Sequence, residues 1–190
     1  MPPIVLVFVV TGLACFVIAS FFLGWGAKAD DAGSNPLKTV GWIAMVAGIV
    51  DLITAIYVVM LQTDTEVLKL GAAAVALGGL LGFYGLFFIS VGAAAFFGMD
   101  LRPIANLAVP VGLIPLLWWN FPPFQDHWMF RSIMIVWVIA FLSVTATVYG
   151  KLGAKALGGI LMVTALYTFF LPVAILILNV GTASPFAAIP

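Results

Sequence analysis

Residues 70–97 read LGAAAVALGGLLGFYGLFFISVGAAAFF, an apolar stretch without a charged side chain. A helix needs about 20 predominantly apolar residues to cross the hydrocarbon core of a bilayer, and this stretch exceeds that length. Strands of a membrane barrel would instead show segments of about ten residues with alternating hydrophobicity. The stretch therefore predicts a membrane-spanning helix.

Further apolar runs lie on both sides of this stretch, separated by short polar segments. The six predicted spans are residues 4–24, 40–61, 70–97, 103–119, 132–149 and 156–180. Of the 190 residues, 65% are hydrophobic and 7% are charged, whereas about 25% are charged in an ordinary soluble domain. The sequence predicts an all-α integral membrane protein, one six-helix domain over residues 1–190. The first run has no Lys or Arg before it, so we expect a mature helix and not a secretory signal.

The basic residues of the loops predict the orientation, because cytoplasmic loops are enriched in Lys and Arg. The first, third and fifth loops carry Lys28, Lys38, Arg102, Lys151 and Lys155. The second and fourth loops carry only Lys69 and Arg131. We therefore expect both chain ends on the non-cytoplasmic side of the membrane.

Several classes of function lack their sequence signals. The chain has no glycine-rich loop followed by Lys-Ser/Thr for nucleotide phosphates and no cluster of metal-ligating residues. The net charge is zero and no basic run suggests nucleic acid. We expect neither an enzyme nor a nucleic-acid-binding protein, and neither a cofactor nor a metal. The single histidine, His127, is interpreted as a surface residue between the fourth and fifth spans.

Asp51 is the one acidic residue in the middle of a predicted span, within MVAGIVDLITAIYV. Charged side chains at this depth are costly and face the bundle interior or water. The carboxyl is either a structural group bonded to neighbouring hydroxyls or backbone, or part of a transport path. Candidate partners are Thr54, Asn106, Thr164 and Thr168. A proton relay would need further ionisable groups at depth, which the other spans do not offer.

Large apolar side chains recur at helical spacing on three spans, so each set shares one helix face. The sets are Leu6, Val9 and Leu13; Tyr84 and Phe88; and Trp137 and Phe141. By spacing alone, such residues are more often packing or lipid contacts than pore walls. The small residues of the third span favour close helix packing.

Residues 83–115, FYGLFFISVGAAAFFGMDLRPIANLAVPVGLIP, resemble the third and fourth helices of the AmiS/UreI family of urea and amide channels. In that family an aromatic helix ends in F-G-x-D-x-R-P. The matching residues here are Phe97, Gly98, Asp100, Arg102 and Pro103. The Leu6, Val9 and Leu13 pattern, the six spans and the short loops also agree with the family.

The resemblance implies a bundle of three helical hairpins around a pore in each protomer, with the protomers assembled as a hexamer in the bacterial inner membrane. It implies passive passage of urea or short aliphatic amides, and a functional link to a cytoplasmic amidase or urease. By resemblance, the pore-lining residues are Leu6, Val9, Leu13, Tyr84, Phe88, Trp137, Phe141 and Thr164.

Two departures leave the preferred solute open. Phe141 stands where the urea channels carry a second pore tryptophan, and Thr164 where they carry a glutamate. Acid-gated members have long loops with histidines, so one histidine predicts a channel without pH gating. Two other readings remain: a small proton- or ion-coupled secondary transporter, or a non-conducting membrane subunit of a larger complex.

Overall fold

The computed structural model describes residues 4–25, 33–62, 72–121 and 126–179, and every regular element in them is helical. The elements are α1 (Ile4–Leu23), α2 (Pro36–Gln62), α3 (Ala72–Phe97), α4 (Arg102–Leu113), the 3-10 helix η1 (Ile114–Trp118), α5 (Trp128–Val148), α6 (Ala154–Thr164), the π-helix η2 (Ala165–Phe170) and α7 (Leu171–Leu178). Because η1 continues α4, and η2 and α7 continue α6, the described elements make six helical rods. The all-helical fold predicted from the sequence is confirmed.

The rods have the length and composition of membrane spans. Within the described residues, five stretches are long and apolar enough to cross a membrane: Ile4–Leu23, Pro36–Met60, Ala73–Phe97, Trp128–Val148 and Ala154–Leu178. The remaining rod, Arg102–Trp118, is a shorter apolar helix. Many large apolar side chains point outward from the bundle, as expected of a surface that meets lipid. The chain is a multi-pass membrane protein.

The predicted spans agree with these rods except near some ends. α2 begins at Pro36, earlier than predicted, because Asn35 caps its first turn by accepting a hydrogen bond from the Leu37 N–H at 3.0 Å. The prediction from the sequence placed this polar first turn of α2 in the preceding loop. α5 also begins earlier than predicted, at Trp128, without a side-chain hydrogen bond that caps its first turn. Two of the predicted boundaries, Leu70 and Val180, lie outside the described residues.

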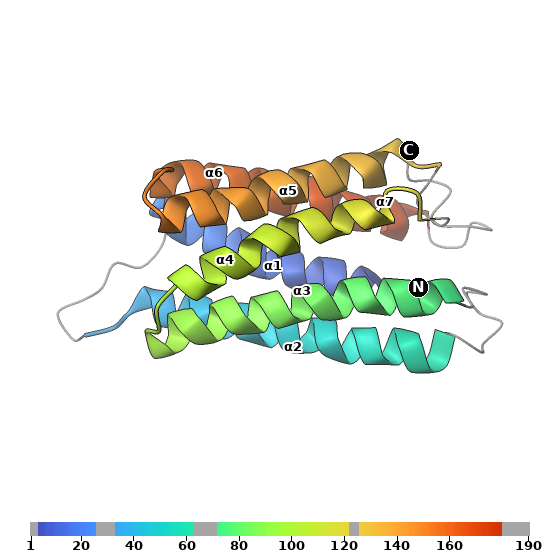
Figure 1. Ribbon diagram of the computed structural model, residues 1–190, viewed down its shortest axis with the longest axis horizontal. Coiled ribbons are helices and arrows are strands. Elements are labelled where there is room, and N and C mark those ends of the chain that lie inside the picture. Colours follow the sequence, from blue (N-terminus) through green and yellow to red (C-terminus); the bar gives the residue numbers. More distant parts are fainter. Residues whose placement is uncertain (1–3, 26–32, 63–71, 122–125, 180–190) are drawn as a thin grey trace.

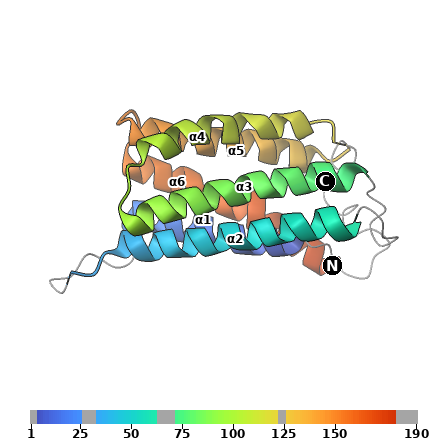
Figure 2. The same ribbon diagram turned by 60° about the horizontal axis from the view of Figure 1, so that its bottom comes forward.

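The six rods lie lengthwise beside one another (Figures 1 and 2), and their contacts close a ring in the order of the sequence. Each rod packs against the rods before and after it, and α6 closes the ring by packing against α1. The most extensive contacts pair α2 with α3, α4 with α5, and α6 with α1. Two of the three pairs are therefore hairpins of consecutive helices, whereas the third joins the first and last rods. α1 begins and α7 ends at the same end of the bundle (Figure 1).

Glycines bring α2 and α3 together backbone to backbone. A Cβ atom added to Gly48 would lie 2.5 Å from the carbonyl oxygen of Gly85. One added to Gly92 would lie 2.4 Å from the backbone nitrogen of Met45. Only hydrogen fits at these positions, which is the close approach that small residues permit between membrane helices.

Candidate functional site

A cavity of about 60 Å³ lies inside the ring of helices. On this measure one water molecule needs about 15 Å³, so the cavity has room for roughly four water-sized groups, or one small solute. Its walls come from α1, α2, α3, α5, α6 and η2. The lining residues are Ile4, Val7, Phe8, Thr11, Cys15, Asp51, Leu80, Leu81, Tyr84, Phe88, Phe130, Ile133, Met134, Trp137, Ala140, Phe141, Thr164 and Phe169.

Aromatic rings from α3, α5 and η2 meet at one side of this cavity. The Tyr84 ring stacks on Phe141 with 5.6 Å between centroids and meets Trp137 edge-on at 4.9 Å. Trp137 in turn lies 5.9 Å from the ring of Phe169. Centroid separations this short are those of rings in contact. A solute therefore cannot pass between Tyr84 and either neighbour unless a ring moves.

The Trp137 ring is held in place by the π-helical segment of the sixth rod. Its Nε1–H donates to Oγ1 of Thr168 at 3.0 Å, and the Thr168 hydroxyl donates to the carbonyl of Thr164 at 2.8 Å. The π turn is completed by the N–H of Leu171, which bonds the carbonyl of Leu166. Single π turns inside α-helices occur frequently at functional sites. Here the widened turn carries both the partner of Trp137 and the ring that packs beside it.

A buried polar pair joins α1 and α2 at the cavity. The Thr11 hydroxyl lies 2.9 Å from Oδ1 and 2.8 Å from Oδ2 of Asp51, and it donates to this carboxyl. Both side chains are buried, and Asp51 has no exposed surface. The expectation that Asp51 faces the bundle interior agrees with this placement.

The partners predicted for Asp51 are wrong, because the four candidate side chains make other hydrogen bonds. Thr54, Thr164 and Thr168 donate to backbone carbonyls one turn earlier on their own helices, and Asn106 accepts from the Tyr149 hydroxyl. Thr11 was missed because it lies within a long apolar run. The signal that could have identified Thr11 is that its hydroxyl stands alone among apolar side chains in the middle of the span.

Most of the residues predicted to line a pore lie together at the cavity. Tyr84, Phe88, Trp137, Phe141 and Thr164 are all lining residues, from three different rods.

On α1 the predicted face does not line the cavity. Leu6 and Leu13 point outward, 53% and 51% exposed, and Val9 is only partly buried beside the core. The cavity is lined instead by the face that carries Ile4, Val7, Phe8, Thr11 and Cys15. Because α1 is apolar on every face, helical spacing could not distinguish the inner face from the outer one.

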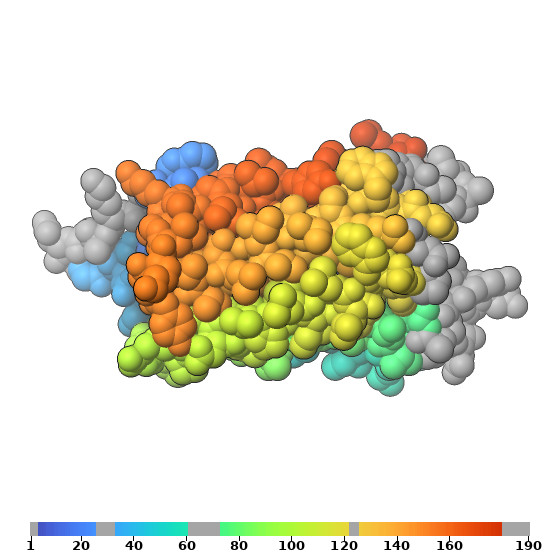
Figure 3. Space-filling model, turned by 45° about the horizontal axis from the view of Figure 1, so that its top comes forward, coloured from blue at the N-terminus to red at the C-terminus, as the bar shows by residue number. Residues whose placement is uncertain are grey.

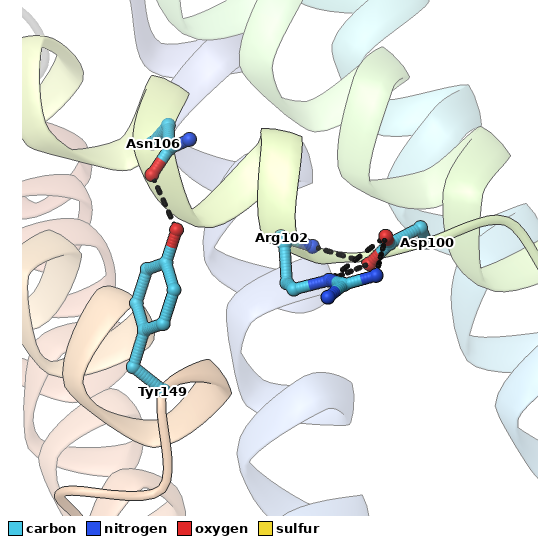
Figure 4. Close-up of polar contacts among 4 residues, drawn as sticks. All are labelled: Asp100, Arg102, Asn106 and Tyr149. Atoms are coloured by element: carbon cyan, nitrogen blue, oxygen red, sulfur yellow. Dashed lines mark hydrogen bonds and ion pairs between the residues drawn. The ribbon is translucent and has the colours of Figure 1, made fainter.

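The residues of the F-G-x-D-x-R-P stretch build the connection between α3 and α4. Gly98 adopts a φ of +71°, the left-handed conformation that ends a helix and favours glycine. Asp100 accepts from the backbone N–H of Arg102 at 2.9 Å and from its Nη2 at 2.7 Å (Figure 4). Pro103 then occupies the first turn of α4, while Phe97 is exposed at the end of α3. These motif residues lie outside the cavity lining.

The polar contacts at this end of the bundle also include a bond between α4 and α5. The Tyr149 hydroxyl donates to Oδ1 of Asn106 at 2.7 Å (Figure 4). The Arg102 guanidinium beside Asp100 holds the pKa of that carboxyl below its usual range.

His127 is half-buried and lies directly before α5, at the opposite end of the bundle. The centroid of its ring is 5.9 Å from that of Phe130.

Among the described residues, no three His, Cys, Asp or Glu side chains come together as a metal-ligand set. The side chains of α4, α5 and α6 lie side by side on one face of the bundle (Figure 3).

Comparison with known proteins shows a likeness of fold. No family profile and no curated protein matches the sequence. The structure is similar to a cryo-EM structure of the Helicobacter pylori urea channel in a closed state, with a TM-score of 0.70 and 14% sequence identity. The match covers 94% of this chain and 98% of that one. The chain therefore shares the fold of that channel.

Proposed function

We propose that the chain is a passive membrane channel for urea or short aliphatic amides. The observation that carries this proposal is a solute-sized cavity enclosed by a ring of six apolar helices and lined by aromatic and aliphatic side chains. A flat neutral amide can slide between such surfaces while losing part of its hydration. An ion would lose far more, so the same lining disfavours ions.

The likeness to a urea channel supports the proposal at the level of fold, since the match spans nearly the whole of both chains. A proton-coupled transporter would need several ionisable groups along its path. Asp51 is the one Asp, Glu, Lys, Arg or His among the lining residues of the described cavity. Gating by histidine is not part of the proposal, because the single histidine lies outside the cavity lining.

The proposal extends to the oligomeric state of the protein and to its orientation in the membrane. We propose a homohexamer in the bacterial inner membrane, with a pore in each protomer and an amidase or urease that consumes the solute. Figure 1 shows that α2 and α4 begin, and α5 ends and α6 begins, at one end of the bundle, whereas α5 begins at the other end. The first end therefore carries Lys38, Arg102, Lys151 and Lys155, and the second carries Arg131. The first end is then cytoplasmic, which leaves both chain ends outside. Lys28 and Lys69, which entered the sequence argument, lie outside the described residues.

The proposal is tested with the purified protein in liposomes, using labelled urea and acetamide. We expect uptake that does not respond to a protonophore, does not saturate at low millimolar solute and stops at the outside concentration. Accumulation above that concentration would show coupled transport instead. Absence of uptake by well-assembled protein would favour a non-conducting subunit of a larger complex.

A further inference from the structure

The π turn η2 of the sixth rod is tied to α5 by the side chains of two adjacent residues. Thr168 accepts the indole N–H of Trp137 at 3.0 Å. The hydroxyls of Tyr167 and Ser132 lie 2.6 Å apart. Because the Ser132 hydroxyl donates its single hydrogen to the carbonyl of Met129 at 2.7 Å, Tyr167 is the donor in its bond to Ser132. Both bonds depend on the register that the π turn has in this structure.

The same turn carries a ring that borders the cavity. Phe169 is a lining residue, and its ring contacts those of Trp137 and of Phe8 on α1, with 5.9 Å and 6.0 Å between centroids. A π turn holds about one residue more than an α turn, so a change of register moves its side chains by one position, about 100° around the helix axis. Such a change would move the partner of Trp137 and the ring beside it together.

Pro172 decides in which direction the π turn can move. The present π bond runs from the N–H of Leu171 to the carbonyl of Leu166. The next bond of this kind toward the C-terminus would need the N–H of residue 172, and proline has none. In the other direction, α6 contains no proline. The π turn can therefore move only into α6.

We propose that this π turn is the gate of the cavity and that the bond between Tyr167 and Ser132 is its latch. In the closed state the latch holds the turn against α5, and Thr168 keeps Trp137 in contact with Tyr84. When the turn moves one residue into α6, Thr168 leaves the indole, and Trp137 can swing away from Tyr84. The contacting rings then separate and the aromatic side of the cavity opens.

Tyr167 and Ser132 act on the gate as positioning residues, since neither is among the lining residues of the described cavity. The inference rests on the proposed channel function and adds the part of the protein that moves when the path opens. Its test therefore needs one measurement that depends on solute flux and one that does not.

The central variant is Tyr167→Phe, which removes the donor of the latch and leaves Ser132 bonded to the carbonyl of Met129. Tyr149→Phe is the matched control, because it removes the same group from another tyrosine outside the cavity lining. The Tyr149 hydroxyl joins the end of α5 to Asn106 on α4, not to the sixth rod.

The two measurements are urea permeability in liposomes and the rate at which N-ethylmaleimide alkylates Cys15. This residue is the single cysteine of the chain, is buried and lines the cavity. Its alkylation therefore reports access to the cavity without any need for urea flux. Cys15→Ala gives the background of the labelling reaction.

We expect Tyr167→Phe to raise both the urea permeability and the alkylation rate by about fivefold, the effect on the open-to-closed ratio of losing one ordinary hydrogen bond. Ser132→Ala should raise both as well, because it removes the acceptor of the same bond. Tyr149→Phe should leave both unchanged.

An alkylation rate in Tyr167→Phe equal to that in Tyr149→Phe would overturn the gate. So would faster alkylation without higher urea permeability, if the wild type conducts urea. If Tyr167→Phe does not assemble, Ser132→Ala decides by the same criteria. Wild-type protein without urea flux, combined with faster alkylation in Tyr167→Phe, would contradict the channel function but support the moving turn, so the two failures are distinguishable.

Discussion

Trp137 donates its indole N–H to the hydroxyl of Thr168 at 3.0 Å, and this bond joins α5 to the π-helical part of the sixth rod. The indole ring contacts the rings of Tyr84 and Phe169, with 4.9 Å and 5.9 Å between ring centroids. Its orientation is therefore fixed by one hydrogen bond and two ring contacts. In the proposed channel, the position of this ring sets the width of the aromatic side of the cavity.

Replacement of Thr168 by Val should loosen Trp137 with almost no change in side-chain volume. The indole N–H would remain buried without an acceptor, which costs about 1–3 kcal/mol. We expect a lower unfolding temperature in detergent and a changed urea permeability. Ser143→Ala is the control, because the Ser143 hydroxyl on α5 bonds the backbone carbonyl of Ile139. Equal behaviour of the two variants would remove Thr168 from the positioning of Trp137.

Trp137→Ala separates a pore role from a packing role. If the indole sets the bore, its removal should raise the ratio of propionamide to urea permeability while the oligomer yield stays high. If the ring only packs the bundle, the loss of about 3–5 kcal/mol of core packing should instead reduce assembly. The measurement is the permeability ratio in liposomes together with oligomer yield. An unchanged ratio in a well-assembled variant would exclude Trp137 from the pore.

The helical spans could be predicted from the sequence because hydrophobicity and length alone decide whether a segment crosses a membrane. Tyr84 and Trp137 were assigned to a pore through the resemblance to a channel family, because their helical spacing alone favoured packing or lipid contacts. The inner face of α1 could not be predicted, because Leu6 and Thr11 lie in a helix that is apolar all round. The π turn at Thr168 depends on tertiary contacts that no local pattern encodes.

Closure of the ring depends on a glycine contact between α6 and α1. A Cβ atom on Gly158 would lie 2.8 Å from the backbone nitrogen of Leu23 and 3.0 Å from the carbonyl oxygen of Ala19. Gly158→Ala should therefore force the two helices apart and destabilise the protein by about 1–3 kcal/mol.

The adjacent residue provides a control within the same helix turn. A Cβ on Gly159 meets nothing within 4 Å, so Gly159→Ala should be neutral or stabilising by up to about 1 kcal/mol, because alanine is the better helix former. Unfolding temperatures in detergent compare the two variants. Equal stability would show that α1 and α6 do not approach each other as closely as described.

The ion pair between Asp100 and Arg102 predicts an acid-sensitive connection between α3 and α4. Because the guanidinium lowers the pKa of Asp100 in the folded protein, the pair stabilises the fold above the unfolded-state pKa of about 3.9. This stabilisation is lost as the pH falls through the lower folded-state value. Stability measured from pH 6 to pH 3 should fall more in the wild type than in Asp100→Asn. The difference should shrink at high salt, because the pair is exposed.

Phe141→Trp should change selectivity in the direction opposite to Trp137→Ala. The Phe141 ring stacks on Tyr84 and meets Phe87 edge-on, with 5.6 Å and 4.9 Å between ring centroids. The larger indole of a tryptophan at this position would therefore have little free space around it. Its extra volume must enter the cavity or strain the packing, and overpacking costs about 1–3 kcal/mol. If the indole enters the cavity, propionamide permeability should fall more than urea permeability. Leu142→Trp, at a residue exposed on the outer face of α5, is the control for the added indole. A ratio that changes equally in both variants would show that Phe141 does not border the solute path.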